Sequence, residues 1–169
     1  RILYRLSTGT RSIEPVENVV KAWALPEPVV RPREGPQRKD NTMTKLSVGV
    51  LGLGLGRYHV GWYADCEHVG RLVVCDPDEE RVRAVREAYP RVVAAYASLD
   101  EMLAAERLDA ISVTTPDHLH RPHAVACLQA GCHVLLAKPI ATTLEDARAI
   151  IATEEAGAAR LMLAHERRY

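Results

Sequence analysis

The sequence predicts a Rossmann-type α/β fold, a doubly wound parallel sheet of about six strands with helices on both faces. From residue 43 onward, short apolar runs alternate with amphipathic runs, as in successive right-handed βαβ units. The apolar runs are rich in valine, leucine and isoleucine, as expected of parallel strands buried on both faces. Three glycines at alternate positions follow the first run, so a tight turn leads from the first strand into the first helix.

Six segments are predicted as strands because each is short, apolar and bounded by polar or turn-forming residues. They are residues 46–51, 71–76, 92–97, 109–115, 132–138 and 159–165. A helical segment connects each strand to the next, and this connection makes neighbouring strands parallel.

The second and third helices carry clear start signals. Asp78 is expected to cap a helix that stops at Pro90 and turns one apolar face inward. That face consists of Val82, Val85 and Tyr89. Ser98 and Glu101 have the spacing of a capping box at the start of the next helix, within residues 98–106.

The last two helices are expected within residues 120–131 and 142–157. Gly131 is a suitable C-cap for the first of them, and Thr142 pairs with Glu145 at the start of the second. The helical period predicts that the final helix turns three apolar residues toward the core. They are Leu144, Ala147 and Ile151.

The glycine turn predicts a dinucleotide-binding loop. Gly52 suits the tight turn, Gly54 the close approach of a phosphate to the helix N-terminus, and Gly56 the packing of helix on strand. The spacing is GxGxG, one residue shorter than the usual GxGxxG, so a tighter loop is expected. A loop that is merely flexible is the alternative interpretation of the glycines alone.

Asp76 supports the dinucleotide interpretation. It ends the second predicted strand, 24 residues after Gly52, close to the spacing of about 20 for the carboxylate that binds the adenosine ribose. A carboxylate there repels a 2′-phosphate and favours NAD over NADP. Arg81 lies near enough in the sequence to keep NADP open.

The first 42 residues differ in composition from the rest of the chain. They hold five of the ten prolines and carry a net charge of +3, against −3 for residues 43–169. We expect residues 1–42 to be a disordered extension and residues 43–169 to be an NAD(P)-binding domain. A regulatory or targeting tail is the alternative, although its glutamates argue against a transit peptide.

Composition also excludes several classes of function. The formal net charge is zero, so no nucleic-acid partner is expected, and no apolar run is long enough to span a membrane. The four cysteines form no CxxC pair, so they are expected to be reduced packing residues of a cytoplasmic protein. His118, His120 and His123 lack a matching carboxylate or thiolate cluster, so no metal site is predicted.

Four stretches together resemble the cofactor domain of the Gfo/Idh/MocA oxidoreductases, the family of glucose-fructose oxidoreductase and inositol dehydrogenase. They are "VGVLGLGLGRYH", "VVCDPDEERV", "DAISVTTPDHLHRPHAVACLQAGCHVLLAKPIATTLEDARAI" and "LMLAHERRY". The most specific part runs from "TTPDHLH" to "AKPIATTLEDA", because its order and its Lys-Pro ending are not general Rossmann features. The resemblance covers essentially all of residues 43–169.

The resemblance implies an NAD(P)-dependent oxidation or reduction of a sugar-like or cyclitol-like carbinol. It implies that Lys138 reaches substrate and nicotinamide as the catalytic lysine, although Ala137 replaces the glutamate of the family's Glu-Lys-Pro. It further implies that the turn of Thr114, Thr115 and Pro116 lies by the cofactor ribose, and that His120 lies near the nicotinamide ribose.

Members of that family also carry a second α/β domain, which supplies the substrate pocket and much of the oligomer interface. The sequence stops at Tyr169, so we expect this chain to lack that domain, to be inactive alone and not to complete the oligomer. Two hypotheses follow. The chain is either the cofactor domain of an oxidoreductase or a stand-alone dinucleotide-binding module without catalysis.

Overall fold

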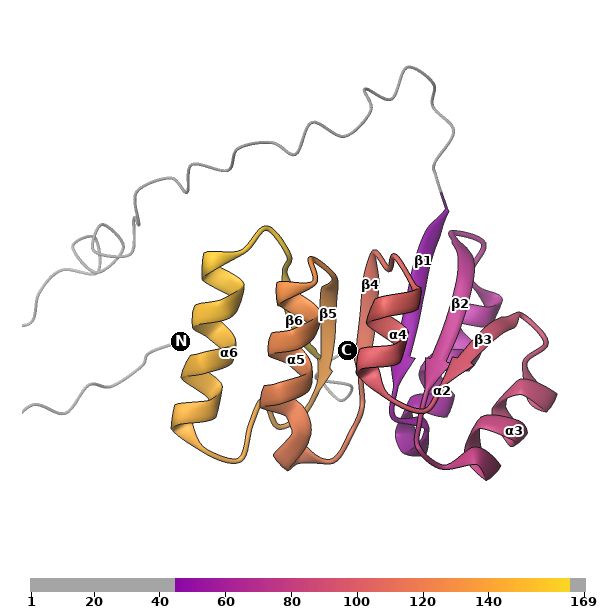
Figure 1. Ribbon diagram of the computed structural model, residues 1–169, viewed down its shortest axis with the longest axis horizontal. Helices are drawn as coiled ribbons and strands as arrows, with labels where there is room; N and C mark the ends of the chain where they lie inside the picture. Colours follow the sequence, from indigo (N-terminus) through magenta and orange to yellow (C-terminus); the bar gives the residue numbers. More distant parts are fainter. Residues whose placement is uncertain (1–44, 165–169) are drawn as a thin grey trace, which may run out of the picture. The chain divides into compact units, whose positions relative to one another are not determined.

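The computed structural model describes residues 45–164 and contains a six-stranded sheet in the order β3-β2-β1-β4-β5-β6 (Figure 1). The strands are β1 (Leu46–Leu51), β2 (Val69–Cys75), β3 (Val92–Tyr96), β4 (Ala110–Val113), β5 (His133–Ala137) and β6 (Leu161–Ala164). All neighbouring strands are parallel. The predicted Rossmann-type fold is confirmed, and each strand begins and ends within two residues of its predicted bounds.

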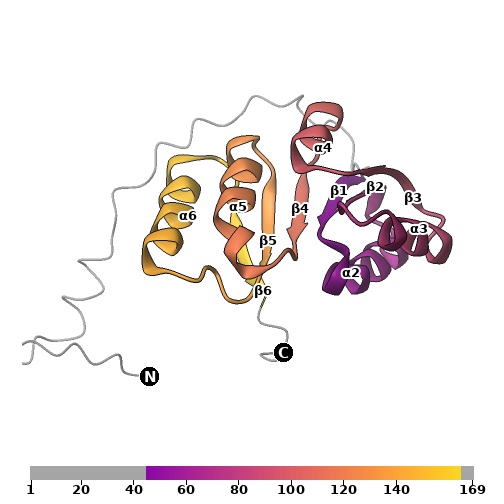
Figure 2. The ribbon, with the colours of Figure 1, turned by 60° about the horizontal axis from the view of Figure 1, so that its bottom comes forward.

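Helices cover both faces of this sheet. They are α2 (Leu53–Asp65), α3 (Glu79–Ala88), α4 (Leu99–Ala105), α5 (His120–Gln129) and α6 (Leu144–Ala156), with a short 3₁₀ helix, η1 (Asp117–Leu119), before α5. Figure 2 shows α4, α5 and α6 along one face and α2 and α3 on the other, beside β1, β2 and β3. The doubly wound arrangement is therefore present.

A separate apolar core fills each side of the sheet. The larger core packs α4, α5 and α6 against strand residues such as Ile111, Val113 and Leu136, which are fully buried. The smaller core packs α2 and α3 against the opposite face, where Val50 and Val74 are fully buried. Burial of alternate residues on both faces explains why these strands read as continuous apolar runs.

The predicted caps of α3, α4 and α5 are confirmed. The Asp78 carboxylate accepts hydrogen bonds from the amides of Glu80 and Arg81, and the Ser98 hydroxyl accepts one from the Glu101 amide. Gly131 follows α5 with φ +82°, and its amide donates to the Leu128 carbonyl. A positive φ at this position is the usual way for a helix to end.

Two predictions for α6 are wrong. The N-cap is Thr143, whose hydroxyl accepts from the Asp146 amide at 3.1 Å, and not Thr142 paired with Glu145. Leu144 and Ile151 are 67% and 46% exposed, and Ala147 is half-buried. Ile150 is the fully buried residue. Successive helical residues are rotated by about 100°, so packing of Ile150 against the larger core turns Ile151 outward.

Several predictions concern residues outside 45–164, and the structure does not test them. The extension at residues 1–42 and the end of the resemblance at residues 165–169 both lie outside the described residues. All four cysteines are described and unpaired, and Cys75, Cys127 and Cys132 are buried. Within residues 45–164, no helix is both long enough and apolar enough to cross a membrane.

Candidate functional site

The turn between β1 and α2 requires glycine at its first position. Gly52 has φ +87°, in the left-handed region that side chains rarely adopt. A Cβ there would also lie 2.9 Å from the Thr114 carbonyl oxygen, which is closer than such contacts allow. Gly52 therefore brings the start of α2 against the loop that follows β4.

Gly54 and Gly56, the other two glycines of this turn, have different surroundings. A Cβ at Gly56 would lie 2.5 Å from the Thr114 hydroxyl and 2.9 Å from Val50, so helix and strand pack through the missing side chain. A Cβ at Gly54 would meet no atom within 4 Å. Gly54 thus leaves open space at the N-terminus of α2, an end of the helix where the backbone amides and the helix dipole favour an anion.

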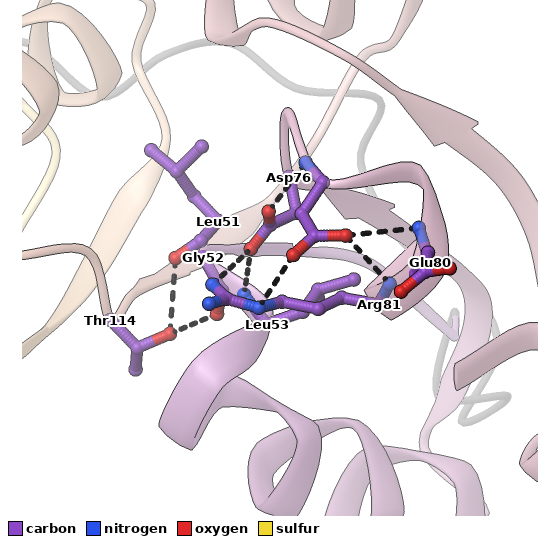
Figure 3. A network of polar contacts seen from close by, with 8 residues as sticks. Leu51, Gly52, Leu53, Asp76, Glu80, Arg81 and Thr114 are labelled. Atoms are coloured by element: carbon purple, nitrogen blue, oxygen red, sulfur yellow. Dashed lines mark hydrogen bonds and ion pairs between the residues drawn. The ribbon is translucent and has the colours of Figure 1, made fainter. Parts of the chain in front are cut away.

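Asp76 lies beside this turn, at the end of β2 (Figure 3). Its carboxylate accepts hydrogen bonds from the Leu53 amide at 2.6 Å and the Asp78 amide at 2.9 Å. The residue is only 4% exposed. A carboxylate has about four acceptor sites, so two remain after these bonds for further donors such as hydroxyl groups.

Arg81 partly offsets the charge of Asp76. Its guanidinium lies 3.7 Å from the Asp76 carboxylate and 3.1 Å from that of Asp78, and its side chain is 54% exposed. Exposed ion pairs of this kind contribute little to stability, so the guanidinium is available to a ligand. The cleft therefore presents one carboxylate and one cation at the same place.

The loop after β4 closes the other side of the turn. The Thr114 hydroxyl donates to the carbonyl groups of Leu51 and Gly52, and the Thr114 amide donates to Leu51 (Figure 3). These bonds fix the loop against the end of β1. Since β1 and β4 are neighbours in the sheet, the loop and the glycine turn meet at the carboxyl edge of the strands.

These segments line one cleft with a volume of about 800 Å³. Four segments of the chain contribute to it, residues 51–55, 75–81, 97–100 and 114–126. Its lining includes Gly52, Gly54, Asp76, Arg81, Ser98, Leu99, Asp100, Thr114, Thr115, Pro116, Leu119, Pro122 and His123. A smaller hollow of about 580 Å³ lies along α3 and β3 and shares only Asp76 and Ala97 with the cleft. Gly52, Gly54, Asp76 and residues 114–116, which the sequence analysis proposes as cofactor-binding residues, thus all line one cleft.

Gly56, His120 and Lys138 do not line this cleft. His120 is fully buried, with Nδ1 2.7 Å from the Pro139 carbonyl oxygen and Nε2 2.9 Å from the Thr115 carbonyl oxygen. Both carbonyl groups are hydrogen-bond acceptors. A neutral imidazole carries one N–H group, so it donates a hydrogen bond to one of these two carbonyl groups at a time. His120 thus links the loop after β4 to the turn after β5, and its ring faces protein atoms where the resemblance implies a cofactor contact.

Lys138 directly follows β5 and is exposed. It lies at the same carboxyl edge as the glycine turn, because all six strands are parallel. The contact of His120 with Pro139, the next residue along the chain, ties this turn to the cleft wall at Thr115. Lys138 is therefore positioned beyond the cleft, on the side of β5.

Sequence reasoning missed the wall contributed by the starts of α4 and α5. Leu99, Leu119 and Pro122 line the cleft there, together with His123, whose Nδ1 lies 3.0 Å from the Thr115 hydroxyl oxygen. A signal was available, since helices that follow strands begin at the carboxyl edge. The contact between Thr115 and His123 itself depends on the turn of η1 between them.

The three histidines of the "HLHRPH" segment do not come together as ligands. His118 is exposed, His120 contacts two carbonyl groups and His123 contacts Thr115. Across residues 45–164, no group of three or more histidine, cysteine, aspartate or glutamate side chains is arranged to hold a metal ion.

Comparisons with known proteins agree with this geometry. Residues 46–165 match the family GFO_IDH_MocA, described as "Oxidoreductase family, NAD-binding Rossmann fold". The chain is 38% identical over 121 residues to inositol 2-dehydrogenase 1 of Saccharopolyspora erythraea. The aligned region covers 70% of this chain and 36% of that protein. The chain is 33% identical over 126 residues to D-apiose dehydrogenase of Paraburkholderia graminis, covering 74% and 33% respectively.

A solved structure shows the same relation. The WlbA dehydrogenase from Bordetella pertussis, crystallised with NADH and UDP-GlcNAcA, superposes with a TM-score of 0.67 at 31% identity. The match covers 73% of this chain and 38% of that one. The chain therefore spans about a third of the length of the curated relatives it matches.

Proposed function

This chain belongs to the Gfo/Idh/MocA oxidoreductase family, and we propose that it supplies the cofactor half of an enzyme acting on a sugar-like or cyclitol-like carbinol. The observation that carries the proposal is the cleft where the N-terminus of α2, Asp76 and residues 114–116 meet. The reaction is the transfer of a hydride between the nicotinamide ring and a carbon that bears a hydroxyl group.

The residues of the cleft fit a dinucleotide. The start of α2, left open at Gly54, would bind the pyrophosphate through backbone amides. Asp76 keeps acceptor sites for the hydroxyl groups of the adenosine ribose. The turn of Thr114, Thr115 and Pro116 would border the central part of the cofactor, since it faces the glycine turn across the cleft.

Lys138 is the proposed catalytic residue. Its ammonium group is a cation at the carboxyl edge of the sheet, on the side of β5 and next to the cleft that holds the proposed cofactor site. A cation beside the reacting oxygen stabilises developing negative charge or takes part in proton transfer. His120 supports this placement through Pro139, so we propose that it positions the lysine turn and does not touch the cofactor.

The surroundings of the cysteines support a cytoplasmic location. Burial raises the pKa of the Cys75 and Cys127 thiols to about 12, so both stay protonated and unreactive at neutral pH. Unpaired, inert thiols are typical of a reducing compartment. We further propose that the substrate is a small polyol or sugar and that this chain alone does not complete the oligomer.

Asp76 also predicts the choice of cofactor. A carboxylate within reach of the ribose repels the 2′-phosphate of NADP. The Arg81 guanidinium, which lies 3.7 Å from the Asp76 carboxylate, attracts that phosphate. Because Asp76 is the buried and fixed partner, NAD is expected to bind more tightly than NADP. Asp76→Ser removes the carboxylate and leaves Arg81, so the preference should narrow or reverse.

Thermal melts of the full chain with NAD and with NADP test both statements. NAD at about 100 times its dissociation constant adds about 2.7 kcal/mol, a shift of a few degrees in melting temperature. Asp109→Ser is the matched control, because Asp109 also accepts from a backbone amide but at the opposite edge of the sheet. No shift with either cofactor in a folded sample rejects the function, and equal affinities in the unmodified chain reject the role of Asp76.

A further inference from the structure

The wall of the cleft formed by α4, η1 and α5 contains a half-buried polar pair among mostly apolar residues. Thr115 and His123 both line the cleft, and the Thr115 hydroxyl oxygen lies 3.0 Å from Nδ1 of His123. Five of the other residues that this wall contributes to the cleft are apolar, and three are polar, namely Ser98, Asp100 and Asp117. The apolar ones are Leu99, Pro116, Leu119, Pro122 and Ala126. Because Thr115 engages Nδ1, the ring has a fixed orientation and Nε2 is the nitrogen left for another partner.

The surroundings of His123 keep its ring neutral. Burial lowers the pKa of His123 below its usual value, and the neighbouring His120 and His118 lower it further. Asp100, at the start of α4, acts in the opposite direction but is a smaller influence than burial. A neutral imidazole at pH 7 suits an uncharged partner, whereas a phosphate is expected to gather cations or amides.

We propose that His123 recognises the purine base of the bound dinucleotide through a hydrogen bond between its Nε2 and the edge of the base. Thr115 is the positioning residue, because it holds the His123 ring in place. The inference rests on the proposed function, that a dinucleotide binds in this cleft. His123 is then a determinant of specificity for the adenosine half of the cofactor.

The layout of the cleft favours the base over other parts of the ligand. The glycine turn is the place for phosphates, and Asp76 is the place for the adenosine ribose. The same cleft is also lined by Arg81 and by the mostly apolar wall that holds His123. A purine is flat and apolar on its faces with polar atoms at its edge, which matches a mostly apolar wall that presents a neutral imidazole.

The nicotinamide end lies elsewhere. Lys138 follows β5, on the far side of β4 from the strands that carry Asp76 and the start of α4. It is not among the residues that line the cleft. The wall with His123 therefore faces the adenosine half of a dinucleotide whose pyrophosphate lies at α2.

Two fragments of NAD separate base recognition from the rest of the site. ADP-ribose contains the purine base, and nicotinamide mononucleotide lacks it. His123→Leu replaces the ring by an apolar side chain of similar size and removes the proposed hydrogen bond to the base. The dissociation constant for ADP-ribose should therefore rise about five- to tenfold. Binding of nicotinamide mononucleotide should stay unchanged. His118→Leu is the matched control, since His118 is exposed and does not line the cleft.

The role of Thr115 requires its own variants. Thr115→Val should weaken ADP-ribose binding by less than His123→Leu, and Thr115→Ser should restore it, because serine keeps the hydroxyl. Adding Thr115→Val to His123→Leu should cause little further loss, since Thr115 acts through the ring. A purely structural role for Thr115 predicts additive losses and no restoration by serine.

Resonances of the His123 ring in the unmodified chain provide a measurement that does not depend on folding of a variant. They should shift on addition of ADP-ribose and not on addition of nicotinamide mononucleotide. An ADP-ribose affinity of His123→Leu within twofold of the His118→Leu control overturns the inference and leaves the proposed function intact. Failure of the unmodified chain to bind ADP-ribose or NAD overturns both.

Discussion

The three glycines of the β1–α2 turn are present for three different physical reasons. Gly52 needs its positive φ, and Gly56 needs the absence of a Cβ because Thr114 and Val50 fill that space. Gly54 needs neither, since a Cβ there would meet nothing in the protein. A glycine that the fold itself does not require, placed at a helix N-terminus, indicates space kept for a ligand.

This difference predicts opposite effects of the same substitution. Gly54→Ala should leave the free protein as stable or stabilise it by up to about 1 kcal/mol, because alanine favours the helix. It should nevertheless weaken NAD binding at least tenfold by occupying the phosphate site. Gly56→Ala should instead lower the melting temperature, since its Cβ would lie 2.5 Å from the Thr114 hydroxyl. Melts and NAD titrations of both variants decide this, and unchanged NAD affinity in Gly54→Ala would contradict it.

At the scale of single elements, one hydrogen bond marks the start of α6. The Thr143 hydroxyl accepts from Asp146 and satisfies an amide that the helix leaves unpaired. Both threonines at 142 and 143 have an acidic residue three positions later, so the sequence pattern fits either one. The choice between them is made when Ile150 packs into the core, which fixes the rotation of the helix.

Alanine substitutions distinguish the two caps. Thr143→Ala should cost about 1 kcal/mol of unfolding free energy, the usual cost of losing an N-cap. Thr142→Ala is the matched control and should stay within about 0.5 kcal/mol of the unmodified chain, as surface substitutions usually do. Chemical denaturation of both variants provides the values, and a larger loss at position 142 would contradict the cap observed here.

The Glu106 carboxylate connects α4 to the strands β2 and β3. Glu106, at the end of α4, accepts two hydrogen bonds from Arg71 on β2, at 2.7 and 2.6 Å, and one from the Tyr96 hydroxyl on β3 at 2.6 Å. Its side chain is only 6% exposed. The hydrogen bonds from Arg71 hold the pKa of the Glu106 carboxyl below its usual range.

This lowered pKa predicts an acid-dependent loss of stability. The unfolded chain takes up the proton near the ordinary value of about 4.3, above the value in the folded protein. The stabilisation is therefore complete above that pH and is lost as the pH falls through the lower folded pKa. Unfolding free energies measured from pH 7 to pH 3 should fall less steeply in Glu106→Gln than in the unmodified chain. Glu80→Gln, at an 86% exposed side chain, should leave the slope unchanged.

At the scale of the whole molecule, strand order places the cleft. The order β3-β2-β1-β4-β5-β6 means that the chain moves outward from β1 in one direction and then from β4 in the other. Connections from β1 and β4 therefore leave the sheet on opposite faces and open a crevice at their carboxyl ends. The glycine turn and residues 114–116 form the two sides of that crevice.

The full chain is expected to bind NAD without catalysing turnover. Lys138 is exposed, and charge stabilisation is effective only in a preorganised site that excludes water. The chain spans about a third of the length of its curated relatives. Absorbance assays with inositols and sugars should detect no NADH, although NAD raises the melting temperature. Robust NADH production would contradict this prediction.

Much of the fold could be predicted from the sequence, because its signals are local. Buried parallel strands are apolar on both faces, so six short apolar runs located all six strands to within two residues. Asp78 and Ser98 cap the helices that follow them, because a short polar side chain reaches only the nearby amides. Gly131 ends α5 for an equally local reason, the left-handed φ of its own backbone.

The sequence by itself determined the α/β order, the glycine turn and the position of Asp76, since each depends on spacing along the chain. Only the tertiary structure decided that Ile150 and not Ile151 faces the core, that both nitrogens of His120 contact carbonyl groups, and that His123 meets Thr115 in the cleft. Those contacts join segments whose rotation and distance are set by packing. A helical period fixes which residues share a face, but the neighbouring surface decides which face is buried.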